Sequence, residues 1–284
     1  MKILVTAYYV SGTVNEGGSG RFMKCVIDTL KDMGHDVTAT TYPRDDAFRH
    51  WDVIICSHHD QLEYVRWNAA KKIYISHGVV AAERAIPGAD FYVSVSEEAQ
   101  APNMVAGFES VVIGQPVMVR EKTELNKTLQ NILVIRRDTD VDHFGFLKGR
   151  FDLRYSDPGR PIEDQIAWAD MCITLGRGAI ESMAQGKTVL VADHRPYIGA
   201  MGDGYLTKRN VAESAKCNFS GRRFKIPLTR EWIESEIAKY NRKDGDHLHE
   251  YAKENHDAVK VVNQYLSLGE TRKGSYAVDC NTSL

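Results

Sequence analysis

The sequence predicts an α/β protein built in two halves, and three observations support this prediction. Short apolar runs alternate with amphipathic stretches along most of the chain, as strands and helices do when they follow one another in parallel sheets. Glycine-rich turns follow several of the apolar runs. At 284 residues the chain is long for one domain and suits two compact halves of about 120 to 150 residues.

The composition is that of a soluble globular protein, with 43% hydrophobic and 26% charged residues. The formal net charge of −2 and the scattered basic residues predict no overall attraction to nucleic acid or to anionic membranes. The five cysteines show no CxxC spacing, so we expect thiols in a reducing compartment and no metal site. No apolar stretch approaches the roughly 18 residues that span a bilayer, and we therefore predict a cytoplasmic protein.

The first half opens with a strand over residues 2–7, a glycine-rich turn and a helix that ends at Gly34. A helix N-terminus offers free backbone N–H groups, so Gly17, Gly18 and Ser19 are candidates for binding phosphate. Two alternatives stay open for this turn. One is a dinucleotide site, although the GxGxxG spacing is absent, and the other is a turn that only reverses the chain.

Two further strands of the first half lead into histidine. Residues 51–56 precede Ser57-His-His-Asp60, and residues 72–76 precede His77. Because the carboxyl ends of parallel strands meet at one edge of a sheet, where catalytic groups gather, His59 and His77 are candidate catalytic residues. A structural role is the alternative for each histidine taken alone.

The end of the first half is marked by a strand over residues 91–95 and a helix that Ser96 caps. Residues 111–117 follow as the last apolar segment of this half. The polar stretch 120–127 has no periodic apolar face, and we predict that it links the two halves.

The second half repeats the strand and helix alternation, with strands expected over residues 131–136, 151–155, 171–174 and 188–192 and helices over residues 161–169, 230–240 and 249–268. Gly176 and Gly178 let the chain turn tightly into a helix that is expected to start near Ala179 and to end at Gly186. Glu181 is then expected in the first helical turn, beside free backbone N–H groups at the carboxyl end of a buried strand.

The stretch that carries Glu181 resembles the nucleotide-sugar site of GT-B glycosyltransferases, especially the retaining kind. In that family a turn of small residues leads into a helix of the form Glu-Ala-Met-Ala-x-Gly-x-Pro-Val, and residues 181–189 are Glu-Ser-Met-Ala-Gln-Gly-Lys-Thr-Val. Ile173 stands where many members carry a second glutamate, eight residues earlier. The resemblance implies two Rossmann-like domains that face a cleft, with the second domain abbreviated.

The same resemblance implies domain boundaries. It places an acceptor-side domain over residues 1–119 and a nucleotide-sugar domain over residues 128–268. Residues 269–284 lose all periodicity and are expected to form a mobile tail.

The roles that the resemblance implies fall mainly on the donor site. Glu181 would accept hydrogen bonds from the ribose hydroxyls, and Gly176, Arg177 and Gly178 would bind the phosphates or the sugar. Arg136, Arg137 and Lys148 are available for a diphosphate clamp, foremost Arg137 and Lys148, and a solvated basic surface is the alternative. Two elements of the first half would also take part, because Gly17, Gly18 and Ser19 form the turn that touches the donor phosphate or the acceptor, and His77 lies where the family has a histidine near the transferred sugar.

The implied function is transfer of a sugar from a nucleotide sugar, foremost a UDP-sugar, to an acceptor with retention of configuration, without a required metal or other cofactor. The acceptor stays open among a carbohydrate, a small molecule and a modified base of phage DNA. One alternative is a sugar-nucleotide epimerase of the same fold. Another is a non-catalytic nucleotide-sugar-binding protein, which Ile173 and the shortened second half favour.

Overall fold

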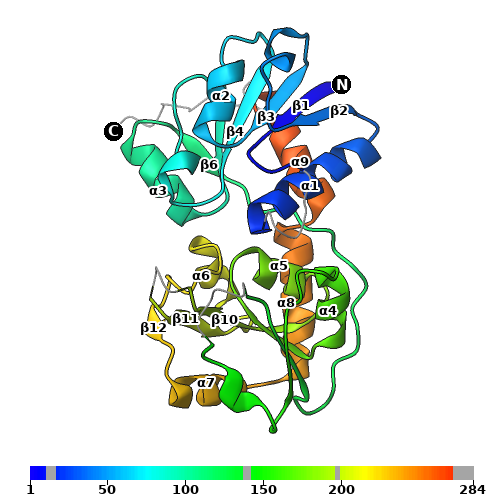
Figure 1. The fold of residues 1–284 in the computed structure, drawn as a ribbon, viewed down its shortest axis with the longest axis vertical. Coiled ribbons are helices and arrows are strands. Elements are labelled where there is room, and N and C mark those ends of the chain that lie inside the picture. Colours follow the sequence, from blue (N-terminus) through cyan, green and yellow to red (C-terminus); the bar gives the residue numbers. More distant parts are fainter. Residues whose placement is uncertain (11–16, 137–141, 196–198, 271–284) are drawn as a thin grey trace, which may run out of the picture.

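The computed structural model describes residues 1–10, 17–136, 142–195 and 199–270, and it consists of two α/β halves stacked along the long axis of the molecule (Figure 1). Each half is organised around a six-stranded sheet. The prediction of an α/β protein in two halves is therefore confirmed.

The first half contains the elements β1 (Lys2–Thr6), α1 (Gly17–Asp32), β2 (Asp36–Thr40), η2 (Asp46–Phe48, a 3-10 helix), β3 (Val53–Cys56), α2 (His59–Val65), β4 (Lys71–Ser76), η3 (Ala81–Glu83, a 3-10 helix), β5 (Phe91–Ser94), α3 (Glu97–Val105) and β6 (Ser110–Val112). Its strands are all parallel and lie in the order β2-β1-β3-β4-β5-β6. The carboxyl ends of these strands thus form one continuous edge.

Strand β1 shows why these apolar runs become central strands. Ile3 and Val5 join the core on one face of the sheet, which α1 covers, and Leu4 joins the core on the other face, which α2 covers. All three side chains are fully buried. A parallel strand that is covered on both faces needs apolar residues at consecutive positions, and the sequence supplies them.

The second half contains β7 (Asn131–Val134), η4 (Gly145–Leu147, a 3-10 helix), β8 (Asp152–Tyr155), α4 (Ile162–Trp168), β9 (Met171–Thr174), α5 (Arg177–Met183), β10 (Thr188–Asp193), β11 (Met201–Tyr205), α6 (Val211–Lys216), β12 (Ile226–Pro227), α7 (Arg230–Ile237) and α8 (Arg242–Asn255), and α9 (Ala258–Ser267) follows them in the chain. The strand order is β12-β11-β10-β9-β7-β8. β7, β8, β9 and β10 pair in parallel, while β11 pairs antiparallel with both β10 and β12.

Strand β11 was not expected, because its sequence Met-Gly-Asp-Gly-Tyr is rich in glycine. Packing explains the glycine at position 202, and backbone conformation explains the one at position 204. A Cβ atom on Gly202 would lie 2.4 Å from the ring of Trp232, a residue of α7, and Gly204 adopts a φ of +92°, which favours glycine. The low intrinsic strand propensity is therefore overridden by the close approach of α7 to the sheet.

The chain crosses between the halves twice, and the two crossings lie side by side. The first lies at Val117, and residues 118–130, which include the proposed linker 120–127, form neither helix nor strand. The second lies at the junction of α8 and α9. Val117 on the first crossing donates its N–H to the carbonyl of His256 at 2.8 Å, and its own carbonyl accepts from Ala258 at 3.0 Å.

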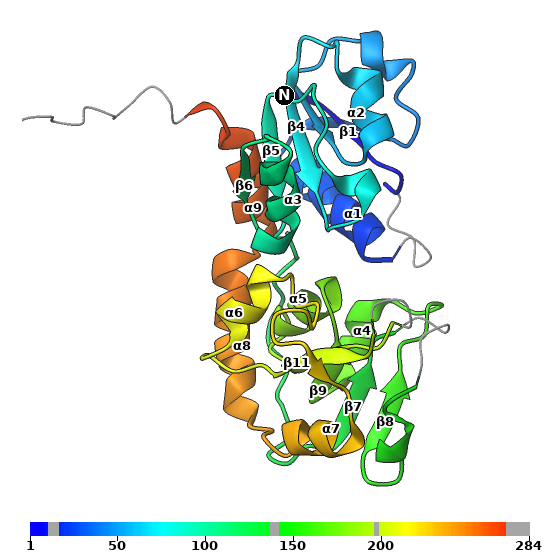
Figure 2. The ribbon, with the colours of Figure 1, turned by 90° about the vertical axis from the view of Figure 1, so that its left-hand side faces the viewer.

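The C-terminal segment differs from the single expected helix over residues 249–268. It forms two helices, α8 and α9, because the side chain of Asp257 accepts a hydrogen bond from the N–H of Lys260 and starts a new helix. α8 packs on the second half, whereas α9 packs on α1 of the first half (Figure 2). Val261, Val262 and Tyr265 belong to the core of the first sheet, although sequence analysis placed this segment with the second half.

No helix in the described part of the chain is both long enough and apolar enough to cross a membrane.

Candidate functional site

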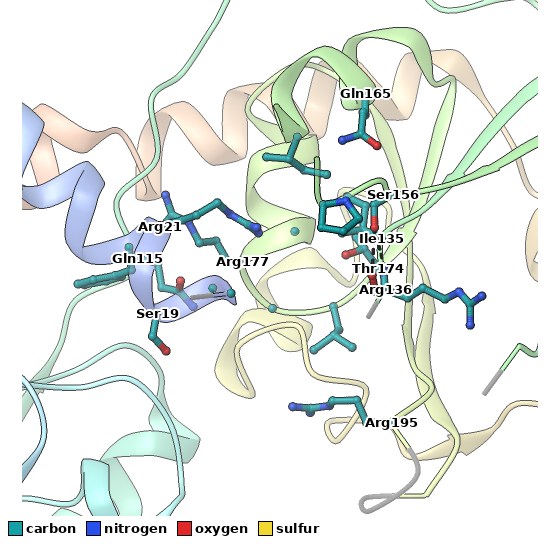
Figure 3. Close-up of a pocket in the computed structure, with 18 of the residues that line it drawn as sticks. Ser19, Arg21, Gln115, Ile135, Arg136, Ser156, Gln165, Thr174, Arg177 and Arg195 are labelled. Atoms are coloured by element: carbon teal, nitrogen blue, oxygen red, sulfur yellow. Dashed lines mark hydrogen bonds between the residues drawn. The ribbon is translucent and has the colours of Figure 1, made fainter. Parts of the chain in front are cut away.

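A cleft of about 680 Å³ lies between the two halves. It is bordered by the strand-to-helix turns of both sheets and by loops that follow their carboxyl ends (Figure 3). Its lining residues are Tyr9, Gly17, Gly18, Ser19, Arg21, Phe22, His77, Gln115, Ile135, Arg136, Ser156, Asp157, Pro158, Arg160, Ile162, Gln165, Thr174, Leu175, Gly176, Arg177, Gly178, His194, Arg195 and Asn218.

Two turns from opposite halves contribute backbone to this cleft. Gly17, Gly18 and Ser19 form the first turn of α1, a helix of 16 residues. The first backbone N–H groups of such a helix have no partner within the helix, and its dipole is positive at this end. The turn between β9 and α5 faces it with Gly176 and Gly178.

Glycine is required at both positions of the second turn. Gly176 adopts a φ of +55°, a conformation that other residues rarely tolerate. A Cβ atom on Gly178 would lie closer to Oγ1 of Thr174 than Cβ atoms come to neighbouring atoms in real structures. Because neither glycine has a side chain, a ligand can approach the backbone of this turn closely.

Arginines dominate the charged lining of the cleft, and three of them pair with carboxylates outside the lining, Arg21 and Arg177 with Glu181 and Arg195 with Asp193. Five arginines contribute to its described lining, namely Arg21, Arg136, Arg160, Arg177 and Arg195. Asp157 is the single carboxylate among these described lining residues. Guanidinium groups present several N–H donors in a fixed plane and match phosphate oxygens well. With Glu181 and Asp193 counted, the five arginines still outnumber the three carboxylates, and this excess favours a negatively charged ligand.

His77, a predicted catalytic residue, follows β4 and lines the cleft. Its ring meets the edge of Phe22, with 4.3 Å between ring centroids, and only 9% of the residue is exposed. Among the described residues its Nε2 atom has no hydrogen-bond partner. Burial, with help from the nearby His58 and Arg177, lowers the pKa of His77 to about 3. The imidazole is therefore neutral at physiological pH and can donate or accept one hydrogen bond to a ligand.

The low pKa of His77 predicts a specific dependence of stability on pH. The unfolded chain binds a proton at this histidine below about pH 6.5, whereas the folded protein does not until about pH 3, so stability is lost as the pH falls through this range. Between pH 7 and pH 5 the His77→Gln variant should lose about 2 kcal/mol less than the wild type. Urea unfolding at both pH values measures this difference, and an equal loss in the two proteins would contradict it.

His59, the second predicted catalytic residue, does not line the cleft. It is the first residue of α2, and the neighbouring His58 takes the place near His77, with 6.2 Å between the two ring centroids. His58 adopts a φ of +76° and stacks on Tyr8 at 4.1 Å between ring centroids. This unusual backbone conformation turns the chain after β3, and a sequence pattern gives no indication of it.

The predicted diphosphate clamp is only partly described. Arg137 lies outside the described residues. Lys148 is exposed, and its ammonium group lies 5.4 Å from the ring centroid of Tyr155 instead of lining the cleft. Arg136, one residue before Arg137, does line the cleft, and its guanidinium lies 4.5 Å from the centroid of the same ring.

Glu181 lies elsewhere than sequence analysis expected. α5 begins at Arg177, directly after the turn at Gly176, so Glu181 is the fifth helical residue and lies outside the first turn. This start places Glu181 one turn after Arg177, whose Nε donates to Oε1 of Glu181 at 2.7 Å. Arg21 of α1 donates to both carboxylate oxygens at 3.1 Å. Glu181 does not line the cleft, and its contact with ribose stays a prediction.

Several lining residues were missed by sequence analysis. Arg21, Arg160 and Arg195 lie far apart in the chain, and each is an ordinary surface arginine by its local sequence. Gln115 and Asn218 join the halves at the cleft, where Nε2 of Gln115 donates to Oδ1 of Asn218 at 2.7 Å. Only the packing of one half on the other brings these residues together.

Groups of three or more histidine, cysteine, aspartate or glutamate side chains in a metal-binding arrangement do not occur among the described residues.

Comparison with known proteins identifies the fold. No protein-family model matches the chain, and no curated protein matches it. Among solved structures, the Anabaena protein Alr3699/HepE, crystallised in complex with UDP-glucose, superposes with a TM-score of 0.58 at 14% identity and covers 95% of this chain and 100% of its own. MurG of Acinetobacter baumannii gives 0.51 at 13% identity, covering 94% of this chain and 99% of that one.

A third similar structure, the glycotransferase of kitacinnamycin, has a TM-score of 0.50 and 10% identity and covers 93% of this chain and 97% of that chain. At such low identity the likeness concerns the fold and leaves the chemistry open. The two facing sheets and these superpositions together show that this chain has the GT-B fold, which it shares with glycosyltransferases.

Proposed function

We propose that this protein is a glycosyltransferase that binds a nucleotide sugar in the cleft between its two halves. The observation that carries the proposal is the composition of the cleft. Two glycine turns face each other across it, and five arginines but one carboxylate contribute to its described lining. A diphosphate fits such a site because its charges pair with guanidinium groups and with backbone N–H groups.

The chemistry of sugar transfer explains why these groups matter. When the bond between the sugar and the diphosphate breaks, negative charge grows on the phosphate oxygen that leaves. Groups that are already oriented toward this oxygen stabilise the transition state more than the ground state. In the proposed site Arg177 and the N–H groups of Gly17, Gly18, Ser19, Gly176 and Gly178 take this role.

The neutral ring of His77 is proposed to contact the transferred sugar or the acceptor. Its unpartnered Nε2 is a buried polar atom at the cleft, and burial without a hydrogen bond costs free energy that a ligand hydroxyl would recover. A retaining outcome is proposed from the sequence resemblance alone.

The donor is proposed to be a UDP-sugar. The sequence resemblance supports it, and so does HepE, which was crystallised with UDP-glucose. Thermal unfolding in the presence of UDP, GDP, ADP and UDP-glucose tests this step. A ligand at 100 times its dissociation constant adds about 2.7 kcal/mol to the stability of the folded state, which shifts the unfolding temperature by several degrees. The proposal fails if none of these nucleotides stabilises the protein.

Products then separate the proposed transfer from its alternatives. Incubation with donor and a panel of carbohydrate, small-molecule and DNA acceptors is expected to release the nucleoside diphosphate and to yield a glycosylated acceptor. Release of the diphosphate with free epimerised sugar, in the absence of any acceptor, would instead identify an epimerase. Stable binding without turnover under all conditions would identify a binding protein.

A further inference from the structure

The carboxylate of Glu181 lies between two guanidinium groups that come from opposite halves of the molecule. Arg21 of α1 donates Nε to Oε1 and Nη2 to Oε2, both at 3.1 Å. Arg177 of α5 donates Nε to Oε1 at 2.7 Å and Nη1 to the carbonyl of Pro116 at 2.9 Å. The side chains of Glu181 and Arg177 are only 10% and 7% exposed, and that of Arg21 is 23% exposed.

Both arginines line the cleft, whereas Glu181 does not. In Figure 3 the side chains of Arg21 and Arg177 lie next to each other, although one comes from α1 and the other from α5. The first turns of these two helices are in contact, since a Cβ atom built on Gly18 would lie 3.6 Å from Cβ of Arg177. The carboxylate therefore fixes two cations from different halves at one end of the cleft.

Arg21, Arg177 and Glu181 together carry an excess positive charge that an anionic ligand can neutralise. One carboxylate faces two guanidinium groups, so the three side chains carry a net charge of +1. Each guanidinium has five N–H donors, and the hydrogen bonds described above use two of them on each arginine, while Arg177 also interacts with the thiol of Cys25. The remaining donors of two neighbouring guanidinium groups suit an anion with several oxygen atoms.

We infer that Glu181 is a positioning residue: its carboxylate keeps Arg21 and Arg177 side by side as their counter-ion, and a diphosphate bound by both halves of the molecule competes with it for their positive charge. This inference rests on the proposed function for the identity of the diphosphate. It differs from the ribose contact that the sequence resemblance implies for Glu181, because the carboxylate acts on the ligand through the two arginines. Donor binding and contact between the halves are then coupled.

The two roles predict opposite results for Glu181→Gln, a substitution that keeps the size of the side chain and removes its charge. In the inferred role, glutamine still accepts a hydrogen bond from the arginines but no longer neutralises their charge, so a diphosphate binds more tightly. In a ribose-binding role, the same substitution removes an acceptor for the ribose hydroxyls and weakens binding of every ligand that contains ribose.

The experiment uses two partial ligands on the full-length chain. Inorganic pyrophosphate has no ribose, and uridine has no phosphate, so calorimetric titration of each reports one part of the site. For Glu181→Gln we expect pyrophosphate to bind roughly 3- to 10-fold more tightly than to the wild type, with unchanged affinity for uridine. Unchanged pyrophosphate affinity with weaker uridine binding would overturn the inference.

A second pair of residues provides the matched control. Arg222 and Glu98 also join the halves, with two hydrogen bonds of 2.6 Å, but neither lines the cleft. Glu98→Gln should leave pyrophosphate affinity at the wild-type value. If it raises the affinity as much as Glu181→Gln does, the effect is a general one of net charge and the inference fails.

The variant Arg21→Gln provides a second test of the inference if Glu181→Gln does not fold. Arg21 is partly exposed near the start of α1, and its replacement should weaken pyrophosphate binding several-fold while leaving uridine binding unchanged. In the double variant the gain from Glu181→Gln should disappear. Unaltered pyrophosphate binding in Arg21→Gln would overturn the inference.

The same titrations distinguish this inference from the proposed function. If the wild type binds pyrophosphate but no nucleoside diphosphate or nucleotide sugar, the proposed function fails and the variants still decide the role of Glu181. If nucleotides bind and the variants show no change in pyrophosphate affinity, the proposed function stands and the inference fails.

Discussion

Replacing Tyr265 with alanine is expected to lower the free energy of unfolding by about 3 to 5 kcal/mol, the usual cost of truncating a large buried aromatic side chain. Tyr265 lies on α9 near the end of the described chain, is fully buried, and packs in the core of the first sheet with Val261 and Val262. Native domains are stable by only about 5 to 15 kcal/mol, so this single change removes much of the stability of the first half. Urea unfolding followed by circular dichroism measures the loss.

Tyr265→Phe is the matched control. The hydroxyl of Tyr265 is buried and has no hydrogen-bond partner among the described residues. Its removal therefore relieves an unsatisfied polar group, and the variant should be as stable as the wild type or more stable by up to about 1 kcal/mol. A loss below about 1 kcal/mol in Tyr265→Ala would show that α9 does not contribute to the core of the first half.

Replacing Arg177 with glutamine is expected to weaken binding of a nucleoside diphosphate by about 10- to 100-fold, since hydrogen bonds between charged groups are among the strongest in proteins. The substitution should also lower the free energy of unfolding by about 3 kcal/mol or more. The cause is the burial of its partners, because the carbonyl of Pro116 and one oxygen of Glu181 each lose a donor at 2.9 and 2.7 Å respectively. Calorimetric titration and urea unfolding measure the two effects.

Arg177→Lys and Arg222→Gln separate charge from geometry in this prediction. A lysine keeps the positive charge, but its single ammonium group cannot reproduce the planar arrangement of donors, so its affinity should lie between the two extremes. Arg222→Gln breaks the ion pair with Glu98 away from the cleft and should bind nucleotides as the wild type does. Wild-type affinity in Arg177→Gln would exclude this arginine from the ligand site.

Most of the fold was predictable because the central strands β1, β3, β4, β7, β9 and β10 are covered on both faces and therefore form nearly continuous apolar runs in the sequence. The turn at Gly176 was predictable for the same local reason, since a tight strand-to-helix turn needs glycine. The break between α8 and α9 was not predicted. Residues 249–268 keep a helical pattern across it, and only the packing of α9 on α1 shows that its apolar face belongs to the other half.

The candidate site also contains residues that the sequence predicts and residues that only the packing of the two halves brings together. The predicted donor turns, Arg177 and His77 line the cleft, because each follows directly from a strand end. Arg21, Arg160 and Arg195 come from separate parts of the chain and meet only after the halves pack together. The position of Glu181 depended on the first residue of α5, and a shift of two residues in the helix start turned its carboxylate toward two arginines.

A crystal structure of the protein with UDP-glucose would show where the donor binds. We expect the diphosphate in the cleft, between the first turn of α1 and the turn at Gly176, within hydrogen-bond distance of both Arg21 and Arg177. A nucleotide bound outside this cleft, or bound in it without contact to either arginine, would exclude the proposed donor site.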